Sequence, residues 1–124
     1  MNRRELLQQA TAIAAGTLLA PRRLRAQSAS GAEAGFFPGF KPFTFQATGA
    51  TINGVIGGSG SPVLLLHGAP QTHLSWRIVA PKLAASHTVV ATDLRGYGDS
   101  SKPPDAEDHS TYSKRAMALD QVEV

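Results

Sequence analysis

The fold is decided by the stretch V-L-L-L-H-G-A-P, which runs from Val63 to Pro70. Its first four residues are apolar and do not alternate with polar ones, which is typical of a strand buried on both faces of a parallel sheet. The run ends at His67-Gly68, where Gly68 can adopt a positive φ and Pro70 fixes its own φ without donating a hydrogen bond. The sequence therefore predicts a turn whose backbone N–H groups are free to face a cleft and to hold an anion.

A second β-branched run, T-V-V-A-T, lies about one helix further along the chain, at 88–92. Strand, helix and strand in this order predict a right-handed βαβ crossover in a parallel sheet. In open parallel sheets a ligand binds beyond the carboxyl ends of the strands, which are followed here by 67–71 and 93–99. We therefore expect the functional site at these two loops.

The segment 75–85 connects the two strands and has apolar residues at helical spacing, with Ser75 or Thr72 as its N-cap. Pro81 interrupts this pattern, because an interior proline removes a helical hydrogen bond. We therefore expect two short helical turns that meet near Ala80.

Two strands are expected before this unit. The first is predicted at 43–47, where apolar and polar residues alternate. The second is predicted at 50–56 and is broken by Asn53-Gly54, a pair typical of tight hairpin turns, with the glycine-rich segment 57–62 as the connector to the buried strand. These glycines fit neither a dinucleotide-binding fingerprint nor a nucleophile elbow, so we assign them to turns.

The last predicted element is an amphipathic helix at 111–124, which follows a solvated loop at 103–109 and has Ser110 or Thr111 as its cap. Its expected apolar face consists of Tyr112, Ala116, Leu119 and Val122. No Gly, Asn or Pro ends the pattern, so we expect this chain to be cut from a longer one.

Several of these motifs together resemble the amino-terminal half of the α/β-hydrolases. They are H-G-A-P at 67–70, Trp76, and D-L-R-G-Y-G-D-S-S-K-P at 93–103. Within that superfamily the sequence is similar to the branch of haloacetate dehalogenases and epoxide hydrolases, and Y-S-K-R-A-M-A followed by D-Q-V favours the dehalogenase side. The resemblance implies an α/β fold in which antiparallel edge strands lead into a parallel βαβ unit and a following helix, within an incomplete sheet.

The resemblance also implies a reaction. In this branch an Asp nucleophile attacks carbon to form an ester, and water activated by a His hydrolyses that ester. By their order along the chain, the nucleophile and the base are expected beyond Val124, so no hydrolase activity is expected for this chain alone. No cofactor is implied.

The site residues that the resemblance assigns to this chain lie around the H-G-A-P turn. The backbone N–H of Ala69 matches one of the two donors that stabilise the oxyanion during ester hydrolysis. Ala69 replaces the Phe or Trp usual in this branch, so an aromatic wall of the pocket is absent and the substrate class stays open. The expected substrate-binding residues are His67, Gly68, Pro70, Gln71 and Trp76.

Alternatives remain within and outside this fold. An epoxide hydrolase or an esterase would share the architecture. In the resembled fold the strand at 63–66 also pairs with a strand that this chain lacks, which leaves an apolar edge open to another chain. A non-enzymatic module completed by a second polypeptide, or a secreted binding protein that uses 67–71 as an anion nest, therefore stays open.

The first 26 residues resemble a twin-arginine export signal. They contain Arg3-Arg4, an apolar run at 10–20 and L-R-A before the expected cleavage site. The run is shorter than the ~20 residues that span a bilayer, so no stable membrane span is expected. The resemblance implies export to the periplasm or beyond; a surface amphipathic helix or a misassigned start codon is the alternative. We expect a linker at 27–42 and a partial hydrolase domain at 43–124.

The charge of the chain comes mainly from this signal. The formal net charge is +3, but the first 26 residues hold five arginines and one glutamate, so the remainder is close to neutral. No basic surface for nucleic acid is therefore expected. The chain has no cysteine, which excludes a disulfide framework and a thiolate site.

The histidines lack the spacing of a metal site, and we expect no metal. We expect His67 to hold the turn through a local hydrogen bond and His73 to line the cleft, while His87 and His109 are assigned to loops. Asp93 and Arg95 favour an ion pair that fixes their loop, with an acid and a substrate clamp as the alternative. Trp76 is interpreted as a core anchor in preference to a ligand contact.

Overall fold

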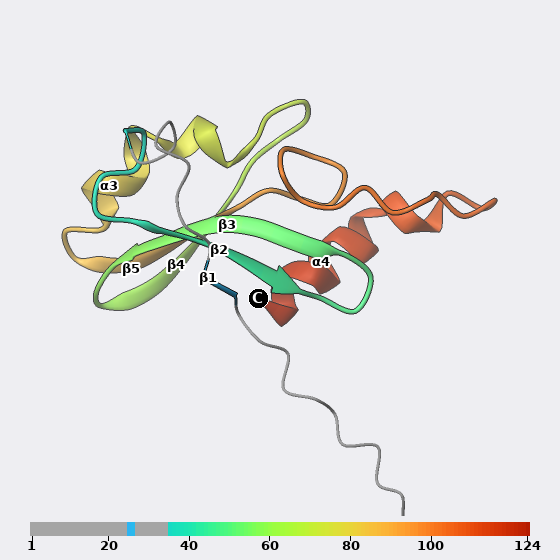
Figure 1. Ribbon diagram of the computed structural model, residues 1–124, viewed down its shortest axis with the longest axis horizontal. Coiled ribbons are helices and arrows are strands. Elements are labelled where there is room, and N and C mark those ends of the chain that lie inside the picture. The colour runs from blue at the N-terminus through green and yellow to red at the C-terminus, as the bar shows by residue number, and fades with distance from the viewer. Residues whose placement is uncertain (1–24, 27–34) are drawn as a thin grey trace, which may run out of the picture.

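The computed structural model describes residues 25–26 and 35–124 (Figure 1). The predicted signal peptide lies outside the described residues except for its last two, and so does the first part of the predicted linker. For these segments the assignment stays a prediction.

The described residues form one mixed sheet with the strand order β1-β2-β3-β5-β4. The strands are β1 (Arg25–Ala26), β2 (Lys41–Gln46), β3 (Thr51–Gly58), β4 (Ser61–Leu66) and β5 (His87–Thr92). The helical elements are the 3₁₀ turn η1 (His73–Trp76), α3 (Val79–Leu83), the 3₁₀ turn η2 (Ser110–Tyr112) and α4 (Lys114–Glu123). Only β4 and β5 pair parallel; the other neighbours pair antiparallel. The predicted α/β architecture is confirmed.

The main core lies between the sheet and α3. Ala80 of α3 is fully buried there, together with Phe37, Val55, Leu65, Val89 and Ala91. Successive side chains of a strand point to opposite faces, so Thr92 lies on the other face of β5. There its hydroxyl donates a hydrogen bond to Gln121 of α4 at 2.7 Å. The helices α3 and α4 therefore lie against opposite faces of the sheet (Figure 1).

Two aromatic residues of the predicted linker belong to this core. Phe37 is buried and Phe40 packs against the core, with their ring centroids 5.6 Å apart. The folded part of the chain therefore begins before Phe43, where the sequence places the domain boundary.

Strand β4 is longer and less buried than predicted. It begins at Ser61, so the connector from β3 shortens to residues 59–60. Leu65 faces the core, but Leu64 and Leu66 are 42% and 43% exposed. The prediction of a strand buried on both faces is wrong for the described residues, because β4 lies at the edge of the sheet and Gln121 of α4 contacts β5 instead.

The pair Asn53-Gly54 does not break a strand, because both residues lie inside β3. A Cβ on Gly54 would lie 2.6 Å from the carbonyl oxygen of Ala91 and 2.9 Å from the Phe43 ring. The glycine is therefore required by the close approach of neighbouring chain segments, not by a turn. The hairpin closes between Ala47 and Ala50, where the Ala47 N–H donates to the Ala50 carbonyl at 2.9 Å.

The elements η1 and α3 are two short helical turns, as predicted, but they are separated at 77–78 and not at Ala80. Thr72 caps η1, since its hydroxyl accepts a hydrogen bond from the Leu74 N–H at 3.3 Å. Pro81 is the third residue of α3, in the first turn, where a backbone N–H has no helical acceptor. The proline is therefore compatible with the start of the helix.

Helix α4 begins later than predicted. Ser113 is its N-cap and accepts a hydrogen bond from the Ala116 N–H at 3.2 Å, whereas Ser110 and Thr111 lie in η2. The prediction of Ser110 or Thr111 as the N-cap is therefore wrong, and the cap lies about one helical turn further along the chain.

The apolar face predicted for α4 is wrong at Leu119 and Val122, whereas Tyr112 and Ala116 are half-buried. Leu119 and Val122 are 53% and 82% exposed, while Asp120 and Gln121 are buried. Polar contacts orient helix α4. Gln121 accepts a hydrogen bond from Thr92 of β5, and Asp120 forms an ion pair with the buried Arg95. In the part of the chain that the structure describes, no helix is both long and apolar enough to cross a membrane.

Gly54→Ala is expected to destabilise the protein, because the added Cβ meets backbone and cannot be accommodated by a rotamer change. Overpacking of this kind typically costs about 1–3 kcal/mol. Gly68→Ala is the matched control, since the nearest atom to its Cβ would be the Gln71 side-chain oxygen at 3.7 Å. Urea unfolding of the two variants measures the difference, and equal midpoints would contradict the account of Gly54.

Candidate functional site

The two loops expected to form the site lie at the carboxyl ends of β4 and β5. We call the turn 67–71 and the loop 93–101 together the strand-end site. The strands are adjacent and parallel, with Leu66 paired to Thr92, so both loops leave the sheet at the same edge. The predicted placement of the loops is confirmed.

The turn after β4 is closed by its own hydrogen bonds. The Gln71 N–H donates to the Gly68 carbonyl at 2.8 Å, and the Gly68 N–H donates to the Gln71 side-chain oxygen at 3.3 Å. Ala69 and Pro70 are exposed and are joined by a cis peptide bond. The Ala69 N–H donates to no acceptor among the described residues. It therefore has the freedom that an oxyanion donor requires, and its role stays a prediction.

His67 joins this turn to the other loop. Its Nε2 accepts a hydrogen bond from the Leu94 N–H at 3.0 Å, and its Nδ1 lies 2.9 Å from the Gly68 carbonyl oxygen. Tyr97 packs edge-on against the ring, with the centroids 5.2 Å apart. The ring is buried and both nitrogens are engaged, which fits the expected local role in holding the turn and leaves no ring nitrogen for a substrate.

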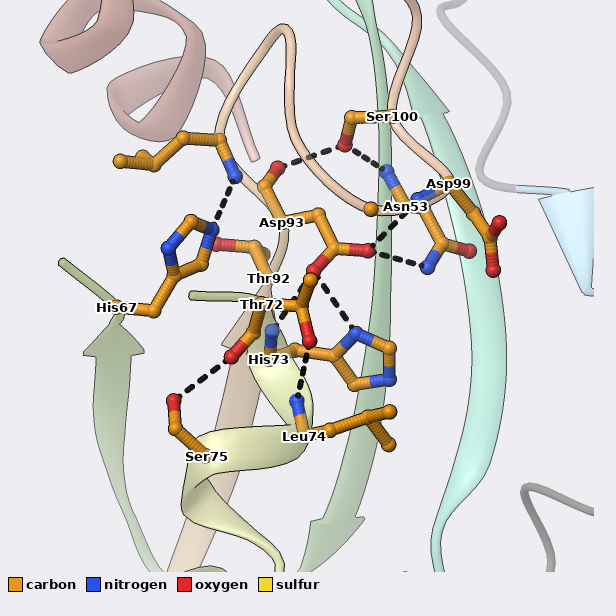
Figure 2. A network of polar contacts seen from close by, with 12 residues as sticks. Asn53, His67, Thr72, His73, Leu74, Ser75, Thr92, Asp93, Asp99 and Ser100 are labelled. Carbon is orange, nitrogen blue, oxygen red and sulfur yellow. Dashed lines mark hydrogen bonds and ion pairs between the residues drawn. The ribbon is translucent and has the colours of Figure 1, made fainter. Parts of the chain in front are cut away.

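Asp93 in the strand-end site is fully buried. Figure 2 shows its polar contacts. One carboxylate oxygen accepts from the His73 N–H at 2.7 Å and contacts the His73 Nδ1 at 2.9 Å. The other accepts from the Asn53 side chain and from the Asp99 N–H, each at 3.1 Å. Burial raises the pKa of Asp93, but the hydrogen bonds from His73 and Asp99 outweigh it and lower the pKa to about 2. Asp93 therefore stays ionised at neutral pH.

The predicted ion pair between Asp93 and Arg95 is not formed. The Arg95 guanidinium instead donates two hydrogen bonds of 2.6 Å to the Asp120 carboxylate of α4 and one of 2.8 Å to the Thr111 carbonyl. The hydrogen bonds to Asp120 raise the pKa of Arg95. The loop turns between the two residues, so that Asp93 points to η1 and β3 while Arg95 points to α4. Both side chains are consumed by structural contacts, which leaves neither as a substrate clamp.

His73 does not line a cleft as predicted. It is buried and stacks on Phe37, with the ring centroids 5.4 Å apart. A histidine whose Nδ1 meets a carboxylate has the form of an acid-base pair. A substrate cannot reach this ring, because its side chain is 3% exposed. The pair of His73 with Asp93 is therefore structural.

Trp76 packs against the core through its ring, and its Nε1 is buried without an acceptor among the described residues. This placement supports the core-anchor interpretation over a substrate contact.

Sequence reasoning missed two polar residues that assemble the site. The Ser100 hydroxyl accepts from the Asn53 N–H at 2.9 Å and donates to the Asp93 carbonyl at 2.7 Å (Figure 2). The sequence predicts Asn53 only as part of a break in a strand and Ser100 only as part of a family motif, and no local signal marks their partners. Within the described ranges, no three His, Cys, Asp or Glu side chains gather as a metal site would require.

Comparisons with known proteins place this geometry in a family. A family model described as alpha/beta hydrolase fold matches residues 61–122. The fluoroacetate dehalogenase of Burkholderia sp. is 56% identical over 88 residues, which cover 71% of this chain and 29% of that protein. The soluble epoxide hydrolase of Corynebacterium sp. (strain C12) is 50% identical over 80 residues, which cover 60% of this chain and 26% of that protein.

A solved structure agrees with these matches. ALR0039 from Nostoc sp PCC 7120 is 58% identical, with a TM-score of 0.66 over 68% of this chain and 29% of that one. The chain thus spans less than a third of the length of these relatives.

The low pKa of Asp93 predicts acid sensitivity. The folded-state pKa lies below the ordinary 3.8, so the stabilisation is complete above that value and is lost as the pH falls toward 2. Asp93→Asn should be less stable than the wild type near neutral pH, and this difference should shrink by about 2 kcal/mol between about pH 5 and pH 2. Urea unfolding at several pH values measures it.

Asp99→Asn, in the same loop but exposed, is the control and should differ little from the wild type throughout. A stability difference for Asp93→Asn that does not change with pH would contradict the prediction.

Asp120→Ala should destabilise the protein by about 3–5 kcal/mol, because it leaves the buried Arg95 guanidinium without its carboxylate. The double variant Arg95→Met with Asp120→Leu should lose less, since no unpaired charge remains. Asp105→Ala removes the exposed contact with His109 and should have little effect. Unfolding midpoints in urea measure all three, and a wild-type midpoint for Asp120→Ala would refute the assignment.

Proposed function

Because the chain belongs to the alpha/beta hydrolase fold family, we propose that it is the amino-terminal part of an exported hydrolase of the haloacetate dehalogenase type. The proposal is supported by the identity of 56% to a fluoroacetate dehalogenase. Export is proposed from the likeness of residues 1–26 to a twin-arginine signal. Since the chain spans 29% of that relative, we propose that the nucleophile and the base lie in polypeptide outside residues 1–124.

The proposed reaction has two steps. A carboxylate oxygen of the nucleophile forms a bond to the carbon that bears the halogen, and the halide leaves with the electron pair of the broken bond. Water, deprotonated by a histidine, then attacks the carbonyl carbon of the ester. Negative charge develops on the carbonyl oxygen at this point, and backbone donors stabilise it. The intermediate then collapses: the ester C–O bond breaks, the histidine returns its proton to the leaving alkoxide, and the carboxylate nucleophile is regenerated.

The observation that carries the proposal is the free N–H of Ala69. It lies in the turn at the carboxyl end of β4, where a parallel sheet binds its ligand, and no described residue accepts its hydrogen bond. The turn around it is held at both ends by hydrogen bonds, so the donor is preorganised. This chain would thus contribute one of the two oxyanion donors.

Two other functions have an observation in their favour. The identity of 50% to a soluble epoxide hydrolase fits the same ester chemistry with an epoxide as substrate and no halide released. The exposed Leu64 and Leu66 at the free edge of β4 fit a module whose sheet is completed by another polypeptide. In either case, the strand that pairs with the free edge of β4 would belong to the rest of the sheet.

The test uses the natural gene product that contains residues 1–124, incubated with fluoroacetate, an epoxide and a nitrophenyl ester. Release of fluoride from fluoroacetate is expected, and none from the 124-residue chain alone. Diol formation without fluoride would favour the epoxide hydrolase, and no turnover of any substrate would overturn the enzyme assignment. Turnover by the 124-residue chain would refute the placement of the nucleophile elsewhere.

The Ala69 donor has its own test in the active protein. Replacing the Gly68–Ala69 amide by an ester, through incorporation of lactic acid at position 69, removes the N–H and also weakens the Gly68 carbonyl as a hydrogen-bond acceptor. The turnover number is expected to fall by about 100- to 1,000-fold, the usual cost of losing one oxyanion donor. Lactic acid at position 85 is the matched control, because Ala85 is exposed and its N–H also donates to no described residue. Equal rates for the two ester variants would show that Ala69 is not a donor.

A further inference from the structure

We propose that His67 is a positioning residue that aims the Ala69 N–H, and that it does so only as a neutral imidazole with its proton on Nδ1. The inference rests on the proposed function, because the direction of this N–H matters to turnover only if the N–H binds an oxyanion. The state of the ring itself does not depend on that function and is measured separately.

The two hydrogen bonds of the ring determine its tautomer. The Leu94 N–H can only donate, so Nε2, at 3.0 Å, must accept and has no proton. The Gly68 carbonyl can only accept, so Nδ1, at 2.9 Å, must carry the proton and donate it. A neutral ring with its proton on Nδ1 satisfies both partners, and the opposite tautomer satisfies neither.

The bond to Gly68 orients Ala69 because both groups belong to one peptide unit. The carbonyl of Gly68 and the N–H of Ala69 lie in one plane and point in opposite directions across a trans peptide bond. This carbonyl accepts from His67 Nδ1 and from the Gln71 N–H. Two donors on the carbonyl therefore set the direction of the N–H that faces away from them.

The bond to Leu94 ties the same ring to the loop after β5. Leu94 directly follows Asp93, whose buried carboxylate is held by several donors. The position of the Leu94 N–H is therefore fixed. The ring of His67 thus transmits the position of that loop to the Gly68–Ala69 peptide.

Protonation breaks this arrangement. An imidazolium has a proton on Nε2 as well, and that proton would point at the Leu94 N–H with two donors 3.0 Å apart. The ring is buried, so water does not replace the lost acceptor without movement of the ring. Movement of the ring removes one of the two donors that hold the Gly68 carbonyl, so the direction of the Ala69 N–H is then set by the Gln71 N–H alone.

The titratable groups around the ring do not offset the added charge. Tyr97, from the loop after β5, meets the ring edge-on. In the same loop, the Asp93 carboxylate is directed to His73 and Asn53, and the Arg95 guanidinium to Asp120. The turn itself presents the neutral Gln71 side chain. In the described part of the chain, no carboxylate pairs with His67 to stabilise an imidazolium.

The first arm of the test measures the ring by NMR on the full 124-residue chain with isotope-labelled histidine. Long-range proton–nitrogen correlations are expected to show the proton of His67 on Nδ1. As the ring becomes protonated at lower pH, the amide resonances of Leu94 and Ala69 should shift together with it. A proton on Nε2 at neutral pH, or a titration that leaves both amides unmoved, would overturn the inference.

The second arm measures turnover by the natural gene product. His67→Ala is expected to lower the turnover number by on the order of tenfold with little change in KM, since one orienting hydrogen bond is lost. His67→Asn should recover most of the lost turnover number, because the Asn amide N–H can occupy the place of Nδ1 and donate to the Gly68 carbonyl. An Asn side chain is not protonated at lower pH, so the turnover number of this variant should not depend on a charge at position 67. His87→Ala is the control, at the opposite end of β5.

The two arms separate the possible failures. An inactive wild type would overturn the proposed function, while the NMR arm would still decide the tautomer. An active enzyme in which His67→Ala is folded and as fast as the wild type would overturn the positioning role and leave the proposed function intact.

Discussion

The arrangement of both loops depends on keeping the carboxylate of Asp93 ionised inside the protein. A buried charge is costly unless donors surround it. Asp93 obtains them from three segments that are far apart in the sequence: η1 through His73, β3 through Asn53, and its own loop through the Asp99 N–H. Because each donor is held in place by the charge that it satisfies, the carboxylate fixes how these segments meet at the carboxyl end of β5.

The three consecutive residues 93–95 contact three different parts of the fold. The Asp93 side chain holds η1 and β3, the Leu94 N–H holds His67, and the Arg95 side chain holds Asp120 of α4. One short loop therefore joins both faces of the sheet and the turn after β4. The turn that contains Ala69 is tied to this set of buried contacts through the ring of His67.

The free edge of β4 is apolar and partly exposed, in contrast to the polar, buried contacts of the two loops. β4 has a partner on one side only among the described strands, and Leu64 and Leu66 are partly open to solvent. Leu119 and Val122 of α4 are exposed as well. Relatives of this family are more than three times as long as the matched segment. The proposed function therefore assumes a larger sheet, in which further strands and helices cover these side chains. The polar contacts at the loops, by contrast, are satisfied within this chain.

What the sequence by itself determined is local. The apolar runs at β4 and β5, the turn at Gly68–Pro70 and the Thr72 cap follow from signals within a few residues, and the parallel pairing follows from the order of strand, helix and strand. The family resemblance added an expectation for Ala69. Only the tertiary structure decided that Asn53-Gly54 continues a strand, that Arg95 pairs with Asp120, and that α4 buries its polar side. These outcomes depend on partners 25 to 47 residues away, such as Asp120 for Arg95 and Ser100 for Asn53. No local pattern encodes them, because the free energy of a buried charge or polar group depends on which distant donor or acceptor the fold brings to it.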